Sequence, residues 1–182
     1  MSLFAFENNE VSHQRKLFVF LDVDFFTTSR TWINLPMMAI VGIVIALIFE
    51  PVDRLILQIL VGIGYGMLVI SSSLCHGLGH ILSSRVANAP MKSLLLTATV
   101  GVTHYEDDGA QASRVHVGRS LGGPLLNLVL GMTSIAIYLF ALDNHFLLFF
   151  GIVSLGFGAF TFLPIPSLDG SVILRELRNW KQ

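Results

Sequence analysis

Two histidines four residues apart are the strongest candidates for chemistry in this sequence. His76 and His80 lie in the stretch Ser73–Leu82, at the end of a long apolar run. If that run is helical, both imidazoles lie on one face, one turn apart, as two ligands of one metal ion require. A hydrolytic zinc helix of this type carries a glutamate directly after the first histidine, as the general base. Gly77 occupies that position here, so the pattern predicts a ligand helix without its base.

The composition predicts an α-helical integral membrane protein with about four transmembrane helices. Hydrophobic residues make up 53% of the 182 residues and charged residues only 13%, and the mean hydropathy is +0.72, whereas a soluble domain carries about 25% charged residues. A single cysteine excludes an internal disulfide. The net charge of −1 gives no indication of nucleic-acid binding. Apolar runs that could cross a bilayer lie at about 33–49, 55–82, 121–142 and 145–163.

The remaining segments are shorter or more polar. Residues 1–32 are predicted to form an N-terminal cytoplasmic or interfacial segment, followed by one membrane domain over 33–182. Within the first segment, 17–26 is too short to span a bilayer and is expected to be an interfacial strand or helix. β-branched residues and polar–apolar alternation predict a small β-hairpin at about 92–118, between the second and third membrane helices. An amphipathic helix is expected at 168–180.

The basic residues predict an orientation in the membrane. If the four apolar runs all span, every one of the 11 Lys and Arg residues except Arg54 falls on the same side. That side is expected to be cytoplasmic and to hold both termini. The second and fourth helices then end at this face, which places Asp169 at the same depth as His76 and His80. An acidic residue at the broken end of a membrane helix is a candidate functional group. Together the three side chains would form a three-ligand zinc site with one open position.

Three blocks of the sequence resemble the site-2 protease family of intramembrane zinc metalloproteases. HGLGH at 76–80 is similar to the family's HExxH, and GPLLN at 123–127 is similar to its GPxxN. FTFLPIPSLDGSVIL at 160–174 is similar to the NxxPxPxLDG block, which supplies the third zinc ligand in the family. The resemblance covers about residues 60–175, and the strand-like stretch between the first two blocks resembles the family's membrane-associated β-hairpin.

The resemblance implies a role for each matching position. It implies zinc as the cofactor, with His76, His80 and Asp169 as its ligands. It implies that Asn127 lies near the substrate or the developing oxyanion. The sequence departs from the family's pattern at three places. Gly77 replaces the glutamate of HExxH, and Thr161 replaces the asparagine that opens the third block. Ser171 and Val172 stand where small and basic residues are common.

Because glycine cannot act as a base, we predict a proteolytically inactive homologue, a pseudoprotease. It would sit among membrane lipids and bind a membrane-protein partner or a transmembrane helix, or serve as a subunit of a membrane complex. One alternative is an active intramembrane protease whose base comes from another residue or from a partner. Another is an accessory subunit in which His76 or His80 ligates a haem or another pigment, with Gly77 and Gly79 allowing a flat ring to approach. The two histidines could also be packing groups that bond neighbouring serines or a backbone carbonyl.

Overall fold

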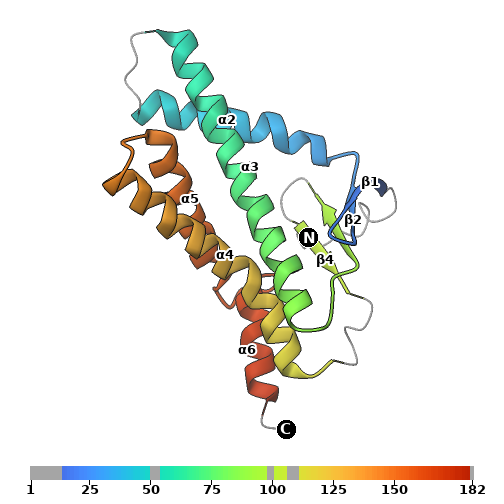
Figure 1. Ribbon diagram of the computed structural model, residues 1–182. Coiled ribbons are helices and arrows are strands. Elements are labelled where there is room, and N and C mark those ends of the chain that lie inside the picture. Colours follow the sequence, from blue (N-terminus) through green and yellow to red (C-terminus); the bar gives the residue numbers. More distant parts are fainter. Residues whose placement is uncertain (1–13, 50–53, 98–100, 106–110, 181–182) are drawn as a thin grey trace.

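The computed structural model describes residues 14–49, 54–97, 101–105 and 111–180, and it is built from long helices with one small sheet (Figure 1). The elements follow one another in the order β1 (Arg15–Phe20), β2 (Val23–Thr27), the 3-10 helix η2 (Thr31–Ile33), α2 (Asn34–Phe49), α3 (Leu55–Val86), β3 (Ser93–Leu96), β4 (Gly101–His104), α4 (Ser113–Phe140), α5 (His145–Thr161) and α6 (Asp169–Asn179).

Within the described residues, three helices are long and apolar enough to cross a membrane. They are η2 with α2, which together have 19 residues, α3 with 32 residues and α4 with 28 residues. The chain is therefore a membrane protein. The sequence predicted four spans, but the fourth helix, α5, has only 17 residues. Its start is fixed by Asn144, whose side chain accepts a hydrogen bond from the Phe146 backbone N–H, and Pro164 follows soon after its end.

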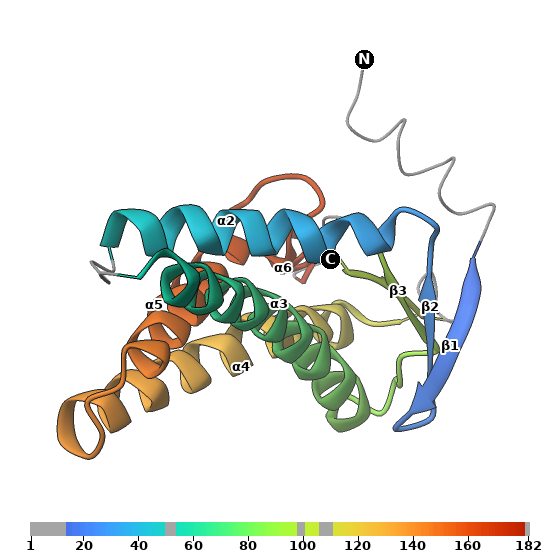
Figure 2. The ribbon, with the colours of Figure 1, turned by 90° about the horizontal axis from the view of Figure 1, so that it is seen from above.

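The sheet has four strands in the order β1-β2-β3-β4, where the sequence predicted only a hairpin. β3 and β4 pair antiparallel, as a hairpin requires. The N-terminal strands β1 and β2 pair antiparallel with each other, and β2 pairs in parallel with β3. That parallel pairing joins segments that are separated in the sequence by all of α2 and α3, so no local sequence pattern predicts it. In Figure 2 the sheet lies at one end of the helices.

The expected extent of the hairpin was wrong at its C-terminal end. Residues 113–118 were assigned to it because polar and apolar residues alternate there. They form the first turns of α4 instead. Alternation over so few residues is also compatible with one face of a helix, and helical geometry buries Arg119 and Ser120 within the protein.

α3 is the central helix. It packs against α2 on one side and against the α4–α5 pair on the other, as Figures 1 and 2 show. Glycines allow the close approaches: a Cβ at Gly42 of α2 would strike the backbone of Gly62 in α3, and one at Gly79 of α3 would strike Gly122 in α4. Small residues at such contacts are typical of membrane helices. They bring the backbone of α4 close to the histidine face of α3.

Candidate metal centre

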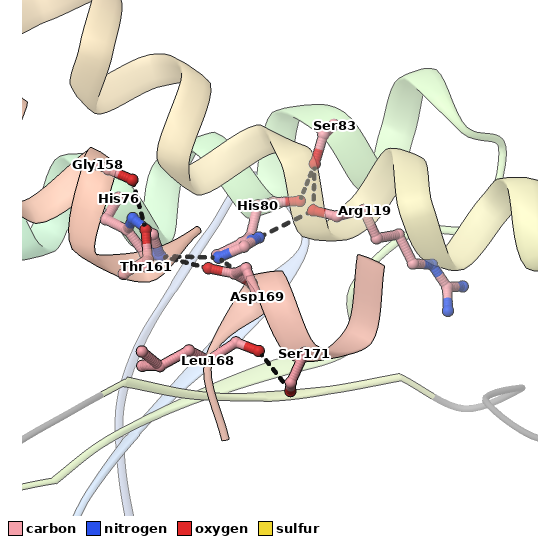
Figure 3. A network of polar contacts seen from close by, with 9 residues as sticks. All are labelled: His76, His80, Ser83, Arg119, Gly158, Thr161, Leu168, Asp169 and Ser171. Atoms are coloured by element: carbon pink, nitrogen blue, oxygen red, sulfur yellow. Dashed lines mark hydrogen bonds and ion pairs between the residues drawn. The ribbon is translucent and has the colours of Figure 1, made fainter. Parts of the chain in front are cut away.

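The structure brings His76, His80 and Asp169 together, although the acid is 93 and 89 residues away from the two histidines (Figure 3). The His76 Nε2 atom lies 3.1 Å from Asp169 Oδ2, and the His80 Nε2 atom lies 3.4 Å from Asp169 Oδ1. The two Nε2 atoms are 3.0 Å apart. All three side chains are largely withdrawn from solvent, with exposed fractions of 13%, 8% and 17%.

These separations fit a tetrahedral metal ion. With zinc–ligand bonds of about 2.0–2.1 Å, neighbouring ligand atoms in a tetrahedron are about 3.3 Å apart. The three observed separations lie within a few tenths of an ångström of that value. Two imidazoles and one carboxylate also form a donor set that suits zinc and leaves a fourth position for another ligand. The residues therefore fit the metal that the resemblance implies.

A hydrogen bond on the far side of His80 fixes its tautomer. His80 Nδ1 lies 2.9 Å from the main-chain oxygen of Arg119. A carbonyl oxygen only accepts, so Nδ1 must carry the hydrogen and donate it. The neutral ring then presents the Nε2 lone pair to the other two side chains, which is the form that a metal ligand needs. His76 differs: its Nδ1 atom is buried and has no hydrogen-bond partner among the described residues.

Two glycines make room for this arrangement. A Cβ at Gly123 of α4 would lie 2.5 Å from His80 Nε2 and 2.6 Å from His76 Nε2, so any side chain there would displace both rings. A Cβ at Gly170 would strike the carbonyl oxygen of Phe162 at the end of α5. The GPLLN and LDG blocks therefore contribute space as well as chemical groups.

Two acidic residues of α6, Asp169 and Glu176, are stabilised in their ionised form by neighbouring side chains. Burial raises the pKa of the Asp169 carboxyl, but its contacts with His76 and His80 outweigh burial and hold the pKa below its usual value. At Glu176 the adjacent Arg175 guanidinium, 2.9 Å away, holds the pKa of the carboxyl below its usual value, with help from the Ser113 hydroxyl. Both acids are thus ionised at neutral pH, and Glu176 joins α6 to the first residue of α4.

The three side chains line a cavity of about 1130 Å³. Its walls come from the strands and from α2, α3, α4, α5 and α6, and they include Trp32, Met38, Ile70, Phe157 and Val172. Gly77 also lines this cavity. A Cβ at Gly77 would meet only Leu94 Cδ2, at 3.2 Å, apart from its own helix backbone and chain neighbours. The position of the expected base thus lies on the wall of the cavity, in close contact with Leu94.

Asn127 and Thr161 differ in their access to the cavity. Asn127 is 0% exposed and is not among the residues that line the cavity. Its two side-chain polar atoms have no partner in the described part of the chain. A contact between Asn127 and a substrate therefore stays a prediction. Thr161 does line the cavity, and its hydroxyl donates to the Gly158 carbonyl oxygen at 3.0 Å.

The sequence reading missed Arg119. Its main-chain carbonyl accepts a hydrogen bond from His80. From the sequence, this residue contributed only to the count of basic residues that predicted the orientation in the membrane. A signal was present, because an arginine at the start of an apolar membrane helix needs compensating partners. Those partners come from distant segments, so their identity required the fold.

Comparison with known proteins supports the fold. No protein-family model matches the sequence, and no curated protein matches it. Among solved structures, the Site-2 Protease from Methanocaldococcus jannaschii is similar, with a TM-score of 0.64 and 18% sequence identity over 93% of this chain and 73% of that chain. The chain has a site-2-protease-like fold. At this identity the likeness concerns the fold alone, and the resemblance read from the three sequence blocks is confirmed at that level. Within this site-2-protease-like fold, the candidate triad joins α3 to α6.

Proposed function

We propose that this chain is a pseudoprotease: a multi-pass membrane protein that keeps a zinc-binding triad but does not cleave peptide bonds. In this proposal the 17-residue α5 also crosses the membrane, at the lower end of the length that a span needs, so that both termini face the cytoplasm. The cavity beside the triad holds a membrane-embedded partner. His76, His80 and Asp169 would hold zinc, which when bound would polarise a water molecule or a carbonyl oxygen.

The observation that carries the proposal is that Gly77, at the position of the expected base, lines the cavity and has no side chain. General-base assistance is worth about 10²–10⁴-fold in rate. The only carboxylates among the described residues that line the cavity are Asp169 and Glu176. Asp169 belongs to the triad. Glu176 lies seven residues further along α6, about 10 Å along the helix axis, and it pairs with Arg175. The acids at 106–108, the nearest in sequence after the histidines, lie outside the described residues.

The shape of the cavity supports a partner role. Apolar side chains of α2, α3 and α5 line it together with the polar triad, so it suits an apolar segment with polar backbone groups. β4 contributes Gly101 and Thr103 to the wall. Among the described strands β4 is an edge, paired only with β3. An extended segment of a partner could therefore add to the sheet by backbone hydrogen bonds.

The pigment-binding alternative draws less support from the geometry. Nε2 of His76 and of His80 converge on Asp169, and Nδ1 of His80 is engaged by a carbonyl, so neither ring is presented to an approaching macrocycle. Gly79 would not admit a flat ring either, because the backbone of α4 packs against it.

Restoring the base tests the proposal. The unchanged protein, Gly77→Glu and Gly77→Gln would be purified in detergent or nanodiscs, loaded with zinc and assayed for cleavage of a model transmembrane helix. Gly77→Gln is the matched control, since it has the same size without a base. We expect cleavage by Gly77→Glu only. A second variant, Gly77→Glu with Leu94→Val, removes the methyl contact in case Leu94 prevents the glutamate from fitting.

Two results would favour the alternative functions. Appreciable cleavage by the unchanged protein, abolished by Asp169→Ala, would contradict the pseudoprotease proposal. It would favour the alternative in which another residue or a partner supplies the base. A visible absorbance band that copurifies with the unchanged protein would favour the pigment-binding alternative.

A further inference from the structure

Arg119 is an arginine buried within the protein. Its exposed fraction is only 3%, although it lies in an apolar helix of a membrane protein. Burying a charge is costly unless partners compensate for it. The Nε–H group donates to the Ala89 carbonyl oxygen at 2.9 Å. The guanidinium carbon lies 4.1 Å from the centre of the Tyr105 ring, a cation–π contact. The side chain is therefore held by two segments that lie outside the helix bundle.

The main chain of the same residue contacts the ligand helix. The Arg119 carbonyl oxygen accepts hydrogen bonds from His80 Nδ1 at 2.9 Å and from the Ser83 hydroxyl at 3.0 Å. Figure 3 shows this oxygen directed toward α3, while the guanidinium points away from the triad. One residue thus links a metal-ligand candidate to Ala89 and Tyr105.

Arg119 also lies between two cavities. It lines the cavity that contains the triad, and it lines a second cavity of about 730 Å³ near the end of α3. Tyr105 directly follows β4, the edge strand where the proposed partner would add. Tyr105 therefore places the end of β4 in direct contact with the Arg119 side chain.

We propose that Arg119 is a positioning residue for His80, and that Tyr105 couples the position of β4 to the orientation of the His80 ring. The anchored guanidinium fixes the first turns of α4 along α3. The carbonyl then stays on Nδ1, which keeps the hydrogen on that nitrogen and leaves Nε2 for a metal ion. The proposal rests on the proposed metal site for its effect on zinc, but the tautomer of His80 is a consequence that needs no metal.

The test uses substitutions that separate anchoring from bulk. Arg119→Met keeps the length of the side chain but removes its charge and its donors. Arg119→Lys keeps a cation and a donor and serves as the rescue variant. Tyr105→Leu removes the ring, whereas Tyr105→Phe keeps its face. The matched control is Arg85→Met, because Arg85 lines the second cavity and pairs with Asp22 at 2.9 Å.

Two readouts are measured on the full chain. The first is the affinity for Co²⁺ and Zn²⁺, with the ligand-field spectrum of bound Co²⁺ as a report on geometry. Arg119→Met keeps the carbonyl that His80 bonds but removes the anchor that holds it in place, so we expect affinity to fall by about tenfold, the lower end of the loss when an outer partner is removed. Tyr105→Leu should give a smaller loss in the same direction. Arg119→Lys should recover part of the affinity, and Tyr105→Phe and Arg85→Met should match the unchanged protein.

The second readout is the His80 tautomer, from ¹⁵N shifts of the metal-free protein. We expect hydrogen on Nδ1 in the unchanged protein and a mixture of tautomers in Arg119→Met. A folded Arg119→Met protein with unchanged affinity and an unchanged tautomer would overturn the proposal. So would an equal effect of Arg85→Met. If Arg119→Met does not fold, Tyr105→Leu is compared with Tyr105→Phe by the same two readouts. Unchanged affinity and an unchanged tautomer in Tyr105→Leu would then overturn the proposal. If the unchanged protein binds neither metal, the proposed metal site fails, and the tautomer alone decides the role of Arg119.

Discussion

Gly77 and the flexible side chain of Leu94 are in close contact at the cavity wall, whereas Gly79, two residues along the same helix, packs against the backbone of α4. A Cβ at position 77 would lie 3.2 Å from the Leu94 Cδ2 atom. A Cβ at position 79 would overlap the carbonyl of Gly122. The two glycines of HGLGH therefore have different consequences. Gly79 is required by helix packing, whereas a side chain at position 77 needs only the end of the Leu94 side chain to shift before it extends into the cavity.

Gly123→Ala should impair metal binding through sterics alone. The added methyl group would lie 2.5–2.6 Å from the Nε2 atoms of both histidines, so the rings must move. We expect at least a tenfold loss of zinc affinity, of the order found when the surroundings of a metal ligand are disturbed. Equilibrium competition with a chelator would measure it. Gly156→Ala is the control, because a Cβ there meets nothing within 4 Å. Equal affinities for the two variants would contradict the geometry described for Gly123.

Asp169→Asn should remove the third ligand while preserving the fold. The amide has nearly the same volume but no charge, and carboxylate oxygen is the usual oxygen ligand of zinc. Elemental analysis of the purified protein should show close to one zinc per chain before the change and a substoichiometric amount after it. Asp143→Asn changes an exposed carboxylate between α4 and α5 and should retain the metal. Full zinc content in Asp169→Asn would exclude this acid as a ligand.

Ser72 and Ser154 should show a measurable coupling between α3 and α5. Their hydroxyls are 3.2 Å apart, and the residues are 1% and 0% exposed. Hydrogen bonds between membrane helices average about 0.6 kcal/mol in double-mutant cycles. The two alanine variants and the double variant, unfolded under the same conditions, should give a coupling energy of about this size. A coupling of zero would indicate that each hydroxyl bonds elsewhere.

The three ligand candidates and the long helices could be predicted from the sequence because each has a recognisable local sequence pattern. His76 and His80 are four apart in an apolar run, and Asp169 follows prolines that must end a helix. The distribution of Lys and Arg residues then predicted that all three lie at the same depth in the membrane. The structure places them together.

The remaining features depend on contacts between distant segments. β2 pairs with β3 across two helices, so 17–26 could only be described as an interfacial strand or helix. The start of α4 at Ser113 follows from burying Arg119 near α3, and the partners Ala89 and Tyr105 lie in other elements. Gly123 was quoted as part of a motif, but its clearance from both imidazoles is a property of packed helices.

The most direct test of the account is the ratio of cleavage rates between Gly77→Glu and Gly77→Gln on one membrane-helix substrate, with both proteins loaded with zinc. A retained metal site that lacks only its base predicts no detectable cleavage by the unchanged protein. It also predicts a ratio of at least about 10², the lower end of general-base assistance. A ratio near one, together with cleavage by the unchanged protein that Asp169→Ala abolishes, would contradict the account.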